Sequence, residues 1–278
     1  MTTRRDELLD APEPDRVNYR FGVMLDHTDF VVEQSYHRGR LARALAYLHG
    51  YGTAAGLEVV WEERGGPDDE EIVIRPGIAV DPIGRLIEVP RDRCVRLRRW
   101  LETWDADKLR LYPAGIVADV FIRFAPCERE KTPAFAHGNF DALDAVVGGR
   151  IRDGVEIRMV PRTEDSPPVP VTPWSALDGA SPAERFGKLS KAILGAWRAA
   201  VPQGVDPETE RLLRPEREIV PAGDLDRGLD WLFLARVTIP ATPGSDGGRP
   251  SRGPGDVDTN NEIRPFAIPV AALARCLL

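Results

Sequence analysis

Glycine and proline constrain this chain more than any other feature of its sequence. Its 278 residues include 25 glycines and 25 prolines, spread along the whole chain rather than collected in one tail. Both residues are typical of turns and loops. The pattern predicts many short strands joined by turns. We therefore expect an α+β, mainly β fold, with small antiparallel sheets, one covering helix each, and long Pro/Gly-rich loops.

The length of the chain indicates more than one domain, because single hydrophobic cores are usually built from fewer residues. Pro12 and Pro14 prevent a long helix at the start of the chain, which reads as an exposed arm. We expect four regions: an N-terminal arm at 1–19, a helix plus β-hairpin domain at 20–100, a β domain at 101–165, and a C-terminal region of helix, strand and flexible loop at 166–278.

Two segments have the pattern of amphipathic helices. The first is predicted at 30–49, with Asp29 as its N-cap. The second begins with Ser181 at the N-cap and Glu184 three residues later, which is a capping box. The first helix has an apolar stripe at three- and four-residue steps, which we expect to pack on a sheet. That stripe consists of Phe30, Gln34, His37, Leu41, Leu45 and Leu48.

The clearest β pattern lies between residues 71 and 97, where we expect one small antiparallel sheet. A turn is predicted at Asp81–Gly84, because proline at the second position and glycine at the fourth are typical of β-turns. Residues 125–152 are expected to be irregular, and 240–261 to form a mobile loop or to bind a neighbour. The predicted strands are 57–61, 72–74, 78–80, 86–89, 93–97, 116–124, 155–160 and 231–239.

Charge and cysteine content exclude several classes of protein. The formal net charge of −7 argues against general nucleic-acid binding, and the arginine-rich run at 91–99 fits a strand with outward arginines. No apolar run is long enough for membrane insertion. Cys94, Cys127 and Cys276 are scattered, which favours neither a disulfide framework nor a zinc finger. We expect a cytoplasmic protein without a secretory signal.

The histidines do not indicate a metal site. His37 and His49 are separated by roughly 18 Å of helix rise, so they cannot share an ion within one helix. His27 lies on another segment, and we expect neither a metal nor another cofactor. His37 is predicted to be buried and hydrogen-bonded near Gln34 or Glu33. His49 is placed to interact with carbonyls at the helix C-terminus.

Common catalytic and phosphate-binding motifs are absent from the sequence. There is no GxSxG motif, and the acidic run 68–71 is typical of a solvated loop. Gly50, Gly52 and Gly56 follow a helix and precede a strand, the reverse of the dinucleotide-binding order. We expect these glycines to adopt positive φ angles in a tight passage from helix to strand.

Two motifs resemble proteins encoded in gene clusters for phage-tail-like contractile injection systems. The first is Leu48-His49-Gly50-Tyr51-Gly52, continued by Gly56-Leu57-Glu58-Val59. The second is Pro76-Gly77-Ile78-Ala79-Val80-Asp81-Pro82-Ile83-Gly84-Arg85. The resemblance covers about residues 20–95, with weaker similarity around the 231–237 strand. The motif positions of interest are Gln34, His37, His49, Gly50, Gly52, Gly56, Asp81 and Gly84.

The resemblance implies a non-enzymatic structural component at the baseplate of such a particle or at its periphery, or an adaptor between the particle and something else. Its partners would be other subunits, such as baseplate, sheath or tube proteins, and it could be released from the cytoplasm with the particle. An alternative is a carbohydrate- or surface-binding β module that uses Trp100, Trp104 and Trp174, although core packing also explains these tryptophans. A second alternative is a hydrolase that uses Asp81 or Asp119.

Overall fold

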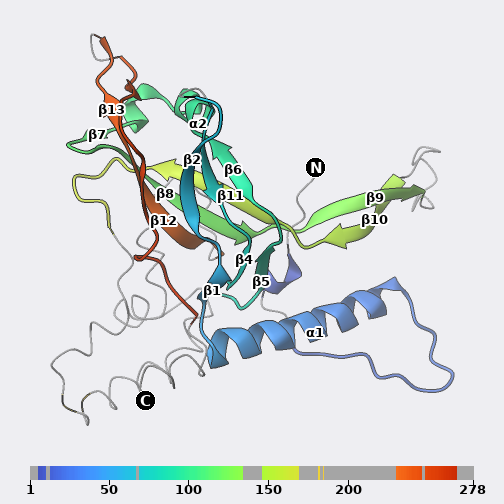
Figure 1. Cartoon of the computed structure of the whole chain (residues 1–278). Helices are drawn as coiled ribbons and strands as arrows, with labels where there is room; N and C mark the ends of the chain where they lie inside the picture. The colour runs from blue at the N-terminus through green and yellow to red at the C-terminus, as the bar shows by residue number, and fades with distance from the viewer. Residues whose placement is uncertain are drawn as a thin grey trace.

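The computed structural model describes residues 6–10, 13–66, 69–133, 146–168, 181, 184, 230–245 and 248–267. Within these residues the fold is α+β and mainly β, as the sequence predicts, with several small antiparallel sheets and two α-helices (Figure 1). The helices are α1 (His27–Leu48) and α2 (Leu97–Thr103), and the short 3-10 helices are η1 (Glu7–Asp10) and η2 (Ala106–Lys108).

Two three-stranded sheets are built from the first third of the chain. One has the order β1-β4-β5 and the other the order β2-β3-β6. The strands of the first sheet are β1 (Gly52–Gly56), β4 (Gly77–Val80) and β5 (Leu86–Val89). Those of the second are β2 (Val59–Glu63), β3 (Glu70–Ile74) and β6 (Arg93–Arg96).

The remaining strands form one larger sheet and two short hairpins. The larger sheet has the order β11-β8-β12-β15, and β7 pairs with β8 beside this path. Its strands are β7 (Leu111–Tyr112), β8 (Gly115–Phe124), β11 (Val155–Pro161), β12 (Leu232–Ile239) and β15 (Asp258–Asn260). The hairpins pair β9 (Cys127–Pro133) with β10 (Val146–Arg152), and β13 (Ala241–Thr242) with β14 (Ser251–Arg252).

The pairing between residues 71 and 97 is nested rather than consecutive. The turn at Pro76-Gly77 does not join neighbours of one sheet, because β3 pairs with β2 and β6 while β4 pairs with β1 and β5. The expectation of one sheet here is therefore wrong. Strand β4 leaves the plane of β3, because Gly77 lets the backbone of β4 approach β1 closely. A Cβ added at Gly77 would lie 2.3 Å from the carbonyl oxygen of Ala55 in β1.

Strand β8 forms the centre of the core. Eight of its ten residues are buried, because β11 and β12 flank it on both edges and other elements cover both its faces. The predicted pairing of the 116–124 strand with 155–160 is confirmed. One face of β8 joins the main core. On the opposite face, Phe121 packs edge-to-face on Phe233, with 5.7 Å between the ring centroids.

The main core draws on three of the regions expected from the sequence. It includes Ile72 and Ile87 from the first sheets, Val120 from β8, and Leu234 from β12. All four side chains are completely buried. Residues 20–100, 101–165 and 166–278 thus contribute to one cluster, while the domain boundaries themselves stay a prediction.

Helix α1 differs from its prediction at its start and in its packing. Its N-cap is Asp26 rather than Asp29, and Asp29 occupies the third helical position of a capping box. Ala42 is the only buried residue of the helix, so the predicted apolar stripe faces outward instead of covering a sheet. Only a narrow face of α1 packs on the rest of the fold. Its small residues contact η1 and the β4–β5 turn.

Two segments expected as loops contain strands. Residues 125–152 include the β9–β10 hairpin, which projects from the body of the molecule (Figure 1). Residues 240–261 include β13, β14 and β15. Arg252 anchors the latter segment through Glu70, with Nη2 2.7 Å from Oε1. Of the second predicted helix, only the two capping residues are described. Ser181 and Glu184 form the expected capping box, in which the backbone N–H of Ser181 donates to Oε2 of Glu184 at 2.8 Å.

Candidate functional site

The turn between β4 and β5 is held by the side chain of Asp81. Oδ1 of Asp81 accepts hydrogen bonds from the backbone N–H groups of Ile83 at 3.1 Å and Arg85 at 2.8 Å. The backbone also closes on itself, since Gly84 N–H donates to the Asp81 carbonyl oxygen at 2.9 Å. The predicted turn is therefore confirmed, and a short carboxylate at position 81 is what orders it.

Gly84 allows this turn to lie directly against helix α1. Its φ angle is +93°, which L side chains rarely adopt. An added Cβ would lie 1.8 Å from the carbonyl oxygen of Ala42. Glycine is thus required at position 84 twice, for its backbone conformation and for the close approach to α1.

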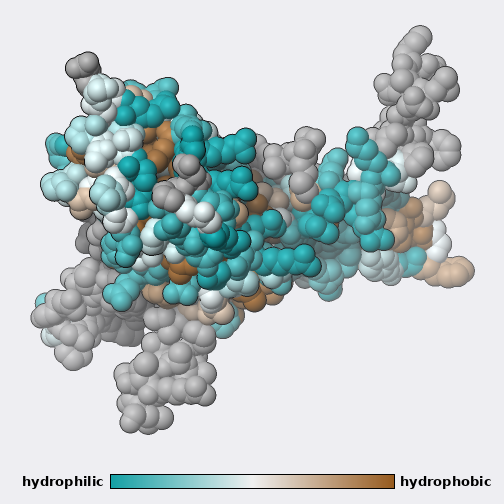
Figure 2. All heavy atoms as spheres, turned by 45° about the horizontal axis from the view of Figure 1, so that its top comes forward, coloured by the Kyte–Doolittle hydropathy of each residue, from teal (hydrophilic) through white to brown (hydrophobic). Residues whose placement is uncertain are grey.

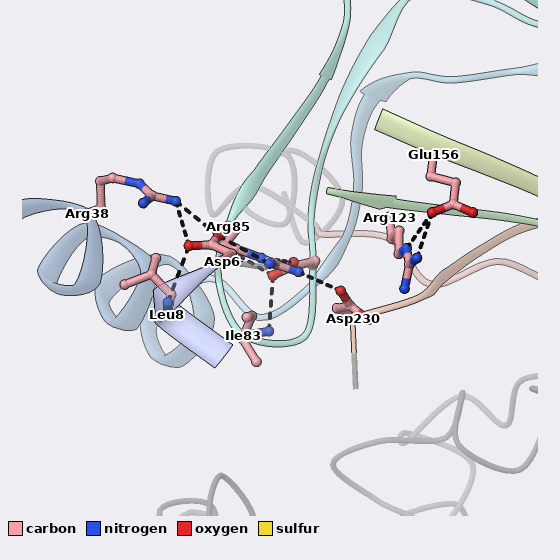
Figure 3. Close-up of polar contacts among 9 residues, drawn as sticks. Asp6, Leu8, Arg38, Ile83, Arg85, Arg123, Glu156 and Asp230 are labelled. Atoms are coloured by element: carbon pink, nitrogen blue, oxygen red, sulfur yellow. Dashed lines mark hydrogen bonds and ion pairs between the residues drawn. The ribbon is translucent and has the colours of Figure 1, made fainter. Parts of the chain in front are cut away.

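Arg85 joins three aspartates that are far apart in the sequence, of which Asp6 and Asp230 are labelled in Figure 3. Its Nε donates to Oδ2 of Asp81 at 2.7 Å. Its Nη1 donates to Oδ2 of Asp6 at 3.2 Å, and its Nη2 to Oδ2 of Asp230 at 3.1 Å. The guanidinium also lies 4.9 Å from the ring centroid of Phe124. All three ion pairs are buried, so Arg85 links three separate segments of the chain.

Arg38 extends this buried charge cluster, which we define as Asp6, Arg38, Asp81, Arg85 and Asp230. Nη2 of Arg38 donates to both carboxylate oxygens of Asp6, at 2.9 and 3.0 Å. The cluster therefore ties η1, α1, the β4–β5 turn and the start of β12 together (Figure 3). Three carboxylates face two guanidiniums, which leaves the cluster with one surplus negative charge when every group is ionised.

Burial dominates the titration of Asp81. Burial raises the pKa of Asp81 from its ordinary value of 3.8 to about 6, against the opposing effect of Arg85, and the charge on Asp230 raises it further. Burial alone would lower the pKa of Arg85, but the charges and hydrogen bonds of Asp81 and Asp230 together outweigh burial and raise that pKa. Oδ1 of Asp230 has no hydrogen-bond partner among the described residues.

Asp119 lies in a second arginine site on the larger sheet. Arg236 binds it in a two-point arrangement, with Nε 2.8 Å from Oδ1 and Nη2 3.0 Å from Oδ2. Arg162 Nη1 lies 3.5 Å from Oδ2. Burial raises the pKa of Asp119. Asp81 and Asp119 are the carboxylates considered for a hydrolase, and both are inaccessible to solvent and bound to arginines.

The glycines after α1 adopt positive φ angles, as the sequence predicts, and two of them also lie close to other backbone segments. Gly50, Gly52 and Gly56 have φ angles of +75°, +134° and +63°. A Cβ at Gly52 would lie 2.6 Å from the Pro265 carbonyl oxygen, and one at Gly56 would lie 2.2 Å from that of Pro76. The motif therefore brings β1 against two other backbone segments.

The remaining motif residues are on or beside α1, away from the buried charge cluster. His37 is exposed rather than buried, although its predicted partner is confirmed, since Nε2 lies 3.0 Å from Oε1 of Glu33. Gln34 is also exposed. His49 is the C-cap, and its backbone N–H donates to the Leu45 carbonyl oxygen at 3.0 Å. The burial prediction failed because the stripe that carries His37 faces solvent.

Sequence reasoning missed most members of the buried charge cluster. Asp6 and Asp230 are 79 and 145 positions from Arg85, and no local pattern links them. It also missed Asn261, whose side chain accepts from Val59 N–H and donates to the Val59 carbonyl oxygen, both at 2.8 Å. Arg264 supports this contact by donating to the Leu57 carbonyl oxygen at 2.7 Å, and burial lowers its pKa to about 10.

Two of the three tryptophans considered for sugar binding lie in the described residues, and both pack against other side chains. Trp100 is buried, and its Nε1 donates to the Met159 carbonyl oxygen at 2.6 Å. Trp104 is partly buried and lies 6.4 Å from Trp100 between ring centroids. Trp174 lies outside the described residues. Core packing therefore accounts for Trp100 and Trp104.

The described residues also bear on metal binding, disulfide formation and membrane insertion. They contain no group of three or more His, Cys, Asp or Glu side chains arranged to hold a metal ion. Cys94 is exposed and Cys127 is buried, each as an unbridged thiol, while Cys276 lies outside this part of the chain. None of the helices there combines the length and apolar character needed to cross a membrane. No protein-family model matches the chain, and a search of curated proteins finds no match.

Proposed function

We propose that this chain is a non-enzymatic structural component of a contractile, phage-tail-like injection particle, at the baseplate or its periphery. The resemblance of the Leu48–Val59 and Pro76–Arg85 motifs suggests the type of particle. The observation that carries a role in assembly is the arm at residues 13–25, an extended segment whose large apolar side chains are left exposed by the part of the chain that the structure describes.

The arm carries large apolar side chains in an exposed position. Phe21 is fully exposed and Met24 is 92% exposed, and both precede the N-cap of α1. Figure 2 shows apolar atoms at the end of the molecule where this arm lies. The other exposed large apolar residues of the arm are Tyr19, Val23 and Leu25.

A partner surface would stabilise this arm strongly. Burial of one large apolar side chain contributes about 1.5–3 kcal/mol, so several in one short segment can supply much of a subunit contact. Within the arm, Val17 N–H donates to Oε2 of Glu33 in α1 at 3.2 Å. The arm passes beside α1 and joins it at Asp26 (Figure 1). An extended arm of this kind suits a subunit that wraps a neighbour.

Sedimentation of lysate from the native host tests this proposal. The chain should travel with large particles beside a sheath protein, and it should leave that fraction when the sheath genes are deleted. A chain that remains at the top of the gradient in wild-type lysate would contradict the proposal.

A matched pair of variants tests the arm itself. Phe21→Ser with Met24→Ser should release the chain from the particle fraction without lowering its stability, because both side chains are exposed. The control is Leu111→Ser with Ile151→Ser, which changes two exposed apolar residues elsewhere and should leave particle association intact. Equal behaviour of the two variants would exclude the arm as the contact.

A further inference from the structure

The outward face of α1 carries a regular row of six residues. They follow one another at steps of four, three, four, three and four, which is the 3.5-residue period of a coiled-coil seam. All six are exposed. This outer seam consists of Phe30, Gln34, His37, Leu41, Ala44 and Leu48.

The rest of the molecule packs on another face of the same helix. Ser35 Oγ donates to Oε2 of Glu7 at 2.6 Å, and Gly39 lies against the side chain of Leu8 in η1. Ala42 contacts Gly84. These positions are rotated away from the outer seam, since residues four apart share a face and residues one or two apart do not. Among the described residues, none covers the outer seam, which is therefore open to a partner.

We propose that the outer seam binds the same seam of a second copy of this chain, with the two α1 helices antiparallel. In that register Phe30 packs against Leu48 of the second copy, Gln34 against Ala44, and His37 against Leu41. The largest apolar residues at the two ends thus cover one another. The seam extends for about 27 Å, a length typical of short coiled-coil pairs.

The charges along α1 favour the antiparallel direction. Its beginning is acidic, with Asp26, Asp29 and Glu33, and its second half is basic. An antiparallel pair places the acidic end of each helix near the basic half of the other, and it also opposes the two helix dipoles. A parallel pair would place like charges side by side. Arg40 lies beside the two-fold axis, where its long side chain can reach solvent.

Sedimentation velocity of the purified full-length chain tests the self-association. The wild type should form dimers in a concentration-dependent manner. Leu48→Glu should weaken dimerisation by at least about 100-fold, because it places a charge against Phe30 of the second copy and beside the acidic start of that helix. The control Leu111→Glu changes an exposed leucine of β7 and should still dimerise. A wild-type chain that stays monomeric at every concentration would overturn the proposal.

Disulfide trapping tests the direction of the pair. Phe30→Cys and Leu48→Cys are made separately in a Cys94→Ser background, since Cys94 is exposed. A mixture of the two should form a bridge between residues 30 and 48, identified by mass spectrometry, while neither variant alone should bridge to itself. Bridges between identical positions would overturn the antiparallel arrangement. Because both tests use the purified chain, their outcome does not depend on whether it enters a particle.

Discussion

Arg85 and Asp81 are four residues apart, and their side chains form a buried ion pair with a 2.7 Å separation between Nε and Oδ2. The same guanidinium also binds Asp6 and Asp230, so one arginine neutralises charge from three segments. The pair thus orders its own turn and fixes that turn to the rest of the fold.

Replacement of Arg85 should cause a large loss of stability. Arg85→Leu leaves three buried carboxylates with Arg38 as the nearest remaining cation of the cluster, and we expect a loss of about 3–5 kcal/mol in the free energy of unfolding. Urea denaturation at neutral pH measures this loss. Arg75→Leu is the control, because Arg75 forms more exposed ion pairs with Glu62 and Asp92 and should matter little. Equal losses in the two variants would contradict a central role for the cluster.

The stability of the wild-type protein should depend on pH through Asp81. Its pKa is about 6 in the folded state and 3.8 in its ordinary state, so the folded chain binds more protons between these values. Stability contributed by the protonated carboxyl is complete below pH 3.8 and is lost as the pH rises through about 6, by roughly 3 kcal/mol.

The variant Asp81→Asn isolates this contribution, because an amide does not titrate. Unfolding free energies of the wild type and the variant, measured by urea denaturation from pH 4 to 7, should diverge across that window. The raised pKa of Asp119 affects both proteins and cancels in the difference. Two parallel curves would show that Asp81 does not titrate in this range.

Gly84 should tolerate no side chain. Gly84→Ala combines an unfavourable φ angle with a clash against the Ala42 carbonyl, and we expect a loss of at least about 3 kcal/mol. Gly22→Ala is a matched control, since Gly22 has a φ angle of +83° and open space around it, and should lose only about 1–2 kcal/mol. Thermal unfolding of both variants separates the backbone strain from the contact with α1.

Asn261 should be important for the junction between β2 and the end of the described chain. Asn261→Ala leaves the N–H and carbonyl groups of Val59 without these partners, and we expect a loss of about 2–3 kcal/mol. Asn260→Ala removes one exposed turn hydrogen bond to Glu262 N–H and should change stability little. Denaturant titrations of the two variants provide the comparison, and a near-neutral Asn261→Ala would mean that water replaces the amide.

The sequence allowed prediction of features whose causes are local. The Asp81–Gly84 turn, the positive φ angles of Gly50, Gly52 and Gly56, and the capping box at Ser181 depend on neighbours within a few residues. Strand β8 could also be predicted, because a central strand is apolar along most of its length.

Features that depend on distant partners could not be predicted. Nothing near Arg85 indicates that Asp6 and Asp230 complete its site. Periodicity shows that α1 has an apolar face but not whether that face packs inside the chain, so His37 and Leu41 were wrongly expected against a sheet. The nested pairing of β3 and β4 likewise depends on β1 and β6 rather than on the turn between them.

The contact between Asn261 and Val59 has a consequence for how the protein is made. These residues are 202 positions apart, and Leu57 meets Arg264 across 207 positions. A ribosome must therefore synthesise nearly the whole chain before β2 obtains these hydrogen bonds. Until then, the apolar strands in the first third of the nascent chain would be incompletely covered. Chains with exposed apolar strands are prone to aggregate. Chaperone binding to nascent chains should accordingly persist until synthesis passes residue 264.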